Sequence, residues 1–256
     1  MRYRCFGQMM EKARKVGPLK VAVAAASDRD VLEAVKMAGE AGFADPILVG
    51  DKPRIVELLK DLEVDPRAVE VVHERDPFQA AQRAVDLIAA GQAQMLMKGL
   101  VNTAVFLKAV LRRENGLRQG KLLCHLSAFE IPGYSRLIFM ADGAFNIAPG
   151  VEEKRQILHN CLDYLHRIGM TEVKVALLAA NEVPSPKMPA SMDAVALAQL
   201  AAKGEFPGAI VEGPLALDGA VSAQALKIKG IQSRINGEAD LLLVPSIEVG
   251  NVLYKS

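Results

Sequence analysis

Residues 20–41 decide the fold, and they read KVAVAAASDRDVLEAVKMAGEA. The apolar run 21–26 has the length of a buried β-strand. After this run, apolar residues recur with the spacing of one helix face. They are Val31, Ala34, Val35, Ala38 and Ala41. The stretch therefore predicts a strand followed by an amphipathic helix that packs against it.

The same strand-then-helix unit recurs along the first half of the chain. Apolar runs predict strands at 47–49, 69–72 and 95–97, and helical spacing follows at 53–62, 77–90 and 103–113. Asp51 and Asp76 precede prolines in the first turns of two of these helices, where a capping carboxylate is favoured. Repeated units of this kind predict an α/β fold with a parallel, helix-covered sheet.

The second half of the chain contains another series of such units. Before it, extended runs at 122–128 and 136–140 flank the turn-forming Pro132-Gly133. The series then predicts helices at 152–168 and 192–203 and strands at 174–179, 209–212 and 239–245. We expect two α/β/α lobes of largely parallel sheet, residues 1–127 and 128–256, with a cleft between them.

Composition excludes several classes of protein. The 256 residues are 51% hydrophobic, enough for one large or two modest cores, and the formal charge is only +1. This charge and the absence of tryptophan argue against nucleic-acid binding and against anionic membrane surfaces. The apolar runs are too short to span a bilayer, and residues 1–18 lack the apolar centre of an export signal. We therefore expect a cytoplasmic protein.

The cysteines and the missing motifs reduce the number of reaction types that the chain could catalyse. The chain has three cysteines, Cys5, Cys124 and Cys161, and none of them are in CxxC spacing. An odd number without this spacing favours packed thiols in a reducing compartment over a disulfide framework or a catalytic nucleophile. The sequence contains no GxGxxG, GxxxxGK[ST], HExxH or GxSxG motif. The absence of these motifs argues against hydride transfer, ATP hydrolysis, zinc chemistry and the simplest type of serine hydrolase. No bound metal is expected.

Four segments follow predicted strands, at the sheet edge where α/β proteins bind ligands. The first, 97–103, reads MKGLVNT and places Lys98 before a glycine turn, with Asn102 and Thr103 at a helix start. An ammonium beside a helix N-terminus suits an anion. The pattern equally suits an ordinary βα turn with a solvated lysine, and composition does not separate the two.

The other three segments also carry small polar side chains. Asp142 and Asn146 lie in 142–149, Asn181 and Asp193 lie in 180–194, and Asn251 lies in 239–255, where a buried strand is expected to end in a polar turn. Each of these side chains suits a ligand site, and each suits a turn or a helix cap as well.

In their order and spacing, these segments resemble the phosphate acetyltransferase and butyryltransferase family from about Phe6 to Lys255. MKG at 97–99 with Asn102-Thr103, and the link EIPGY at 130–134, favour the butyryl branch. The resemblance implies a two-lobed fold like that of isocitrate and isopropylmalate dehydrogenases, with an acyl-CoA and phosphate site in the cleft, and usually a homodimer. It also implies acyltransferase activity, in which butyryl-CoA and phosphate give butyryl phosphate and CoA. CoA and phosphate are then substrates, and no tightly bound cofactor is expected.

The resemblance also suggests which residues contact the substrates. Lys108 is placed, by counting from Thr103, where acetyl-branch members carry a substrate-binding arginine. The expected substrate-binding residues are Lys98, Asn102, Thr103, Lys108, Asp142, Asn146, Asn181, Asp193 and Asn251.

Family members normally continue beyond the Gly-Asn-x-x-Tyr-Lys segment at 250–255. The continuation carries a Ser-Arg motif and an aspartate and completes the first lobe's sheet. The catalytic residues are therefore expected outside residues 1–256. Two alternatives stay open: a non-catalytic acyl-CoA-binding module of the same family, and an oxidoreductase that shares the fold.

Overall fold

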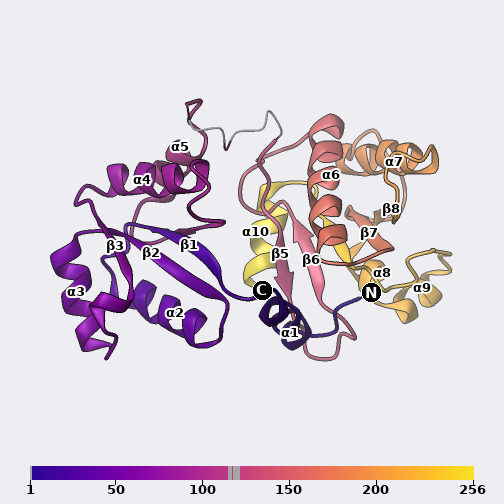
Figure 1. Cartoon of the computed structure of the whole chain (residues 1–256). Coiled ribbons are helices and arrows are strands. Elements are labelled where there is room, and N and C mark those ends of the chain that lie inside the picture. Colours follow the sequence, from indigo (N-terminus) through magenta and orange to yellow (C-terminus); the bar gives the residue numbers. More distant parts are fainter. Residues whose placement is uncertain (1, 115–116, 118–121) are drawn as a thin grey trace. The chain divides into compact units, whose positions relative to one another are not determined.

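The computed structural model describes residues 2–114, 117 and 122–256, which form two compact units (Figure 1). The N-terminal unit comprises residues 10–120, and the C-terminal unit comprises residues 1–9 with 121–256. The division thus lies near residue 120, whereas the expected lobes meet at 127 and 128. The first nine residues belong with the second half of the chain. Helix α1 (Phe6–Val16) runs across the division at residues 9 and 10.

The N-terminal unit contains a parallel sheet in the order β3-β2-β1-β4. Its strands are β1 (Leu19–Ala24), β2 (Ala44–Gly50), β3 (Glu70–His73) and β4 (Met95–Lys98). The chain builds outward from β1 to β3 and then returns to the other side of β1 to form β4. Such a reversal is the point of an α/β sheet at which ligands commonly bind.

Helices cover both faces of this sheet. Val21 and Val23 face one core with α2 (Arg29–Glu40) and α3 (Lys52–Asp61), and Ala22 and Ala24 face another with α4 (Pro77–Ala89) and α5 (Thr103–Val110). The segment between α3 and β3 contains the short 3-10 helix η1 (Pro66–Ala68). Because successive side chains of β1 point to opposite faces of the sheet, each pair of helices packs against a different set of β1 residues.

Side-chain caps mark two of the helix starts. Asp28 Oδ1 accepts a hydrogen bond from Val31 N at 3.1 Å, and Asp76 Oδ1 accepts one from Gln79 N at 2.8 Å. Asp51, expected to cap α3, accepts no capping hydrogen bond within the described part of the chain. Its carboxylate instead lies 3.4 Å from Arg75 Nε, so an ion pair has replaced the cap.

The C-terminal unit contains a five-stranded sheet in the order β5-β6-β9-β7-β8. Its strands are β5 (Ser127–Phe129), β6 (Ile138–Ala141), β7 (Val173–Leu178), β8 (Ala209–Leu215) and β9 (Leu241–Leu243). β5 pairs antiparallel with β6, and the other pairings are parallel. The predicted α/β class with largely parallel sheets is confirmed.

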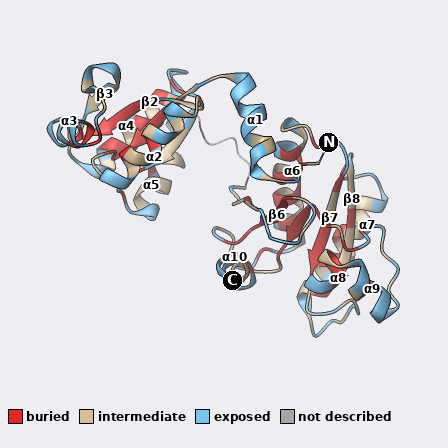
Figure 2. Ribbon diagram, turned by 90° about the horizontal axis from the view of Figure 1, so that it is seen from below, coloured by how far each residue is buried: buried red, intermediate tan, exposed pale blue. Residues whose placement is uncertain are grey.

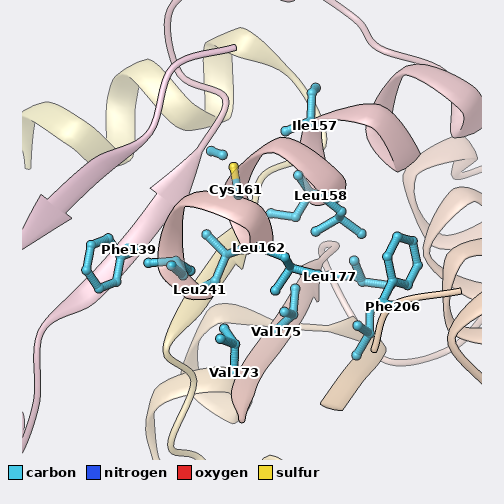
Figure 3. Close-up of a cluster of buried hydrophobic side chains, with 14 of the residues drawn as sticks. Phe139, Ile157, Leu158, Cys161, Leu162, Val173, Val175, Leu177, Phe206 and Leu241 are labelled. Carbon is cyan, nitrogen blue, oxygen red and sulfur yellow. The ribbon is translucent and has the colours of Figure 1, made fainter. Parts of the chain in front are cut away.

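The core of this unit lies on both faces of the sheet (Figure 2). One face packs against α6 (Val151–Arg167) and α7 (Pro189–Ala202). Figure 3 shows Leu158 and Leu162 of α6 close to Val175 and Leu177 of β7. The other face packs against α8 (Leu217–Val221), α9 (Ala223–Lys229) and α10 (Ile247–Lys255). None of the helices in the described ranges is long and apolar enough to cross a membrane.

Candidate functional site

The loop between β4 and α5 lies at the reversal point of the N-terminal sheet. Ala24, the last residue of β1, is paired with Lys98, the last residue of β4. Gly99 N donates a hydrogen bond to Ala24 O at 2.8 Å, and Leu100 N donates one to Ala25 O at 2.9 Å. The loop is therefore tied to the end of β1, as a ligand site at a reversal of strand order requires.

Lys98, Asn102 and Thr103 are brought together in this loop. Lys98 Nζ donates to Val101 O at 2.9 Å and to Gly99 O at 3.3 Å, which holds an exposed ammonium over the turn. Asn102 Oδ1 accepts from Ala104 N at 2.9 Å and caps α5, and Thr103 is the first residue of the helix. A positive side chain thus lies beside the positive end of a helix, an arrangement that attracts anions.

Lys108 points elsewhere in the same unit. It lies in the last turn of α5, and its Nζ is 5.7 Å from the centre of the Phe78 ring on α4. A cation over an aromatic face is stabilised by the ring quadrupole. The structure therefore shows a packing role for Lys108 and leaves its substrate contact a proposal.

Gly99 is required by the close approach of the loop to β1. A Cβ atom at this position would lie 2.5 Å from both Ala24 O and Ala25 O, and backbone oxygens cannot move aside. We expect Gly99→Ala to lower the free energy of unfolding by about 2 kcal/mol because the loop must shift. Urea unfolding followed by circular dichroism measures this.

Gly39→Ala is the matched control for Gly99→Ala. A Cβ at Gly39 would meet Ala44 O at an ordinary 3.6 Å, so this variant should be as stable as the parent chain or slightly more stable. Equal unfolding midpoints for the two variants would contradict the assigned role of Gly99.

The loop after β6 contains a cluster of polar side chains in the C-terminal unit. Asp142 is 2% exposed, and its carboxylate accepts hydrogen bonds from Ala144 N at 2.9 Å, Phe145 N at 3.1 Å and Asn146 Nδ2 at 2.5 Å. Asn146 Nδ2 also donates to Leu123 O at 3.0 Å. The structure thus brings Asp142 and Asn146 together and shows that the carboxylate holds the loop in shape.

Asn251 lies next to this loop, on a helix. Pro245 and Ser246 form the bend after β9, and residues 247–255 then form α10, which the sequence pattern did not predict. A Cβ at Gly250 would lie 2.6 Å from Gly143 Cα, so the glycine allows the helix to approach the Asp142 loop closely. Asn251 therefore borders the loop that contains Asp142 and Asn146.

Asn181 and Asp193 follow β7, and they serve different purposes. Asn181 Oδ1 accepts from Val183 N at 3.0 Å within a local turn. Asp193 lies inside α7, after the cap position Met188, and pairs with Lys154 Nζ at 2.6 Å. The interpretation of Asp193 as a helix cap is wrong because an ion pair with another helix holds its side chain.

Lys154 is a candidate site residue that the sequence analysis missed. Its side chain is buried on α6, 4% exposed, and Asp193 neutralises it. A signal was present in the sequence. Lys154 occupies the helix stripe that continues with Ile157, Leu158 and Cys161, which all face the core. A lysine in such a stripe needs a buried partner.

A pocket of about 620 Å³ opens at the carboxyl ends of β7 and β9 beside α10. None of the described residues that line it is a lysine or an arginine. It therefore lacks the cations that a phosphate requires, in contrast to the β4–α5 loop. Within residues 2–114, 117 and 122–256, no three His, Cys, Asp or Glu side chains are grouped to hold a metal ion.

Comparison with known proteins identifies the family. A family model described as phosphate acetyl/butaryl transferase matches residues 78–256. The phosphate butyryltransferase of Clostridium acetobutylicum is 44% identical over 253 residues, which cover 99% of this chain and 84% of that protein. The probable phosphate butyryltransferase of Bacillus subtilis is 47% identical over 236 residues, 92% of this chain and 78% of that protein.

A solved structure agrees with these sequence relatives. The branched-chain phosphotransacylase from Enterococcus faecalis V583 superposes with a TM-score of 0.81 at 34% identity, covering 93% of this chain and 83% of that one. The predicted family and enzyme class are confirmed, and the non-catalytic alternative is not favoured. The chain belongs to the phosphate acetyl/butyryltransferase family.

Proposed function

We propose that this chain transfers a short-chain acyl group between CoA and phosphate, with butyryl-CoA and phosphate giving butyryl phosphate and CoA. The observation that carries the proposal is that nearly the whole chain is 44 to 47% identical to relatives named as phosphate butyryltransferases. The butyryl preference is further supported by the form of residues 97–103 and 130–134. The expected setting is the cytoplasm, and the expected assembly is a homodimer.

The reaction requires an anion-binding group and a means of stabilising charge. A phosphate oxygen attacks the thioester carbonyl, the carbon–sulfur bond breaks, and CoA leaves as a thiolate. Charge develops on the carbonyl oxygen in the transition state and must be met by fixed donors. A phosphate also needs a cation or a helix N-terminus to replace its water.

The β4–α5 loop supplies such a group in the N-terminal unit. The Lys98 ammonium lies over the turn, and α5 begins at Thr103 after the Asn102 cap. We assign Lys98, Asn102, Thr103 and Lys108 to phosphate or CoA contacts. The second set of proposed contact residues is Asp142, Asn146, Asn181, Asp193 and Asn251. No residue within 1–256 is assigned the acid–base role.

The proposal is tested by CoA release from butyryl-CoA with and without phosphate. We expect phosphate-dependent release, slower with acetyl-CoA, together with a rise in melting temperature when CoA is added. A rise in melting temperature without any release would instead support the binding-module alternative. Reduction of NAD in the presence of a divalent metal would instead support the oxidoreductase alternative.

A further inference from the structure

Two of the three free cysteines lie together in the C-terminal unit. Cys161 is on α6 and is 1% exposed, and Cys124 is half-buried in the segment before β5. Both side chains line one cavity, and each thiol shifts the pKa of the other, although 36 residues separate them along the chain. Figure 3 shows the Cys161 sulfur at the side of α6. Sequence spacing did not reveal this pair.

A cavity makes the pair accessible to small molecules. It has a volume of about 460 Å³, and both cysteines line it, together with Asn160, Ser127 and Tyr164. A peroxide molecule is little larger than water, and a cavity of this size admits several waters. Cys124 can therefore meet a small oxidant without unfolding of the unit.

We propose that Cys124 and Cys161 are a peroxide-responsive thiol pair, in which Cys124 is oxidised first and Cys161 then closes a disulfide with it. Reversible disulfides in reducing compartments are typically redox-sensing.

The surroundings of the two sulfurs assign their order of reaction. The hydrogen bond with Cys161 lowers the pKa of the Cys124 thiol, and the Asn160 amide, 3.8 Å from its sulfur, adds to this against burial and the Asp142 charge. The same hydrogen bond and burial raise the pKa of Cys161 well above its usual value. Because the thiolate is the reactive form, Cys124 attacks first and Cys161 keeps its proton.

The two steps balance with one peroxide. The Cys124 thiolate attacks a peroxide oxygen, the O–O bond breaks, and a sulfenic acid and hydroxide form, the latter taking a proton to become water. Cys161 sulfur then attacks the sulfenic sulfur, the S–O bond breaks, and the released hydroxide takes the Cys161 proton. Two thiols are oxidised to one disulfide while the peroxide is reduced to two waters.

Disulfide formation would act on the Asp142 loop. The segment that carries Cys124 is held by Asn160 Nδ2, which donates to Leu122 O at 2.7 Å, and by Asn146 Nδ2, which donates to Leu123 O. A disulfide requires the sulfurs to approach to about 2 Å, closer than any hydrogen bond. We expect this approach to move the Cys124 segment, and with it the Leu123 carbonyl that positions Asn146.

The test of the pair is a count of alkylated thiols in the intact chain. After brief peroxide treatment and unfolding in urea, N-ethylmaleimide should label one cysteine in place of the three labelled without peroxide, and peptide mapping should find Cys124 joined to Cys161. Cys5→Ser is the matched control and should still form the link. Cys124→Ser and Cys161→Ala should both lose it, and since Cys124 is half-buried its variant should remain folded. Oxidation of single thiols without the link, or a link through Cys5, would overturn the proposal.

A second readout, which rests on the proposed function, is phosphate-dependent CoA release. A shift in the Asn146 position should slow release by at least about tenfold, since misplacing a site by an ångström costs up to ~100-fold. Dithiothreitol should restore the rate, and Cys124→Ser should resist peroxide. Link formation with an unchanged rate would overturn the effect on the loop. If the reduced chain had no activity, this would count against the proposed function, but the thiol count and the peptide map would still test the cysteine pair.

Discussion

Lys98→Met is expected to lower kcat/KM for phosphate by about 100-fold, because a fixed charge that meets the reacting anion is lost. The ammonium is held over the β4–α5 turn by two carbonyls, at 2.9 and 3.3 Å, beside the first turn of α5. The Lys98 side chain is exposed and its two hydrogen bonds are only part-buried, so water can replace the ammonium. The free energy of unfolding should therefore change by less than about 1 kcal/mol. Steady-state kinetics at varied phosphate measures the effect.

Two further variants make this prediction specific. Lys20→Met removes a lysine from the opposite end of the β1–β4 sheet, where it pairs with Asp45 and Glu70, and should leave kcat/KM unchanged. Lys98→Arg keeps the charge and should recover part of the lost rate, although a guanidinium has a different shape. If Lys98→Met were as active as Lys20→Met, the β4–α5 loop would not be the phosphate site.

Lys154→Met is expected to lower the free energy of unfolding of the C-terminal unit by about 3 to 5 kcal/mol. Lys154 is 4% exposed, and its Nζ lies 2.6 Å from Asp193 Oδ2. Removing the cation leaves the partly buried Asp193 carboxylate without its partner, which costs more than the pair itself contributes. Urea unfolding followed by circular dichroism measures the change.

A double substitution separates the charge effect from lost packing. Lys154→Met combined with Asp193→Asn removes the unpaired charge and should be more stable than Lys154→Met alone. Arg29→Met is the control for an exposed pair, because Arg29 and Glu33 form an i,i+4 ion pair at 2.9 Å that contributes only about 0.5 kcal/mol. Equal losses for Lys154→Met and Arg29→Met would show that Lys154 is not held as described.

The strands and helices that the sequence predicts well are those with strong local patterns. The apolar run at 21–26 corresponds to β1, and the helical spacing that follows it corresponds to α2. Both patterns are strong because buried residues must recur with the period of the strand or of the helix. Helix α10 was missed because Gly250 weakens helix formation and the segment follows Pro245-Ser246. Its glycine is explained only by the approach to Gly143, which no local pattern contains.

The sequence predicted which loops carry the candidate site residues, but it did not predict the contacts between residues that are distant along the chain. Lys98 and Asn102 lie in one loop, so their proximity follows from the sequence. The pairs Lys154 with Asp193 and Cys124 with Cys161 join segments that are distant along the chain. Only the packing of α6 against its neighbours brings these groups together. The buried stripe of α6 indicates that Lys154 needs a partner, but residue spacing does not identify Asp193 as that partner.

The most direct test of the proposed activity is to identify the product by phosphorus NMR. The chain is mixed with butyryl-CoA and inorganic phosphate while the free CoA thiol is counted in parallel. An acyl phosphate signal that grows in a one-to-one ratio with free thiol is the predicted result. Free thiol that accumulates without acyl phosphate would show hydrolysis in place of transfer, and would contradict the proposed function.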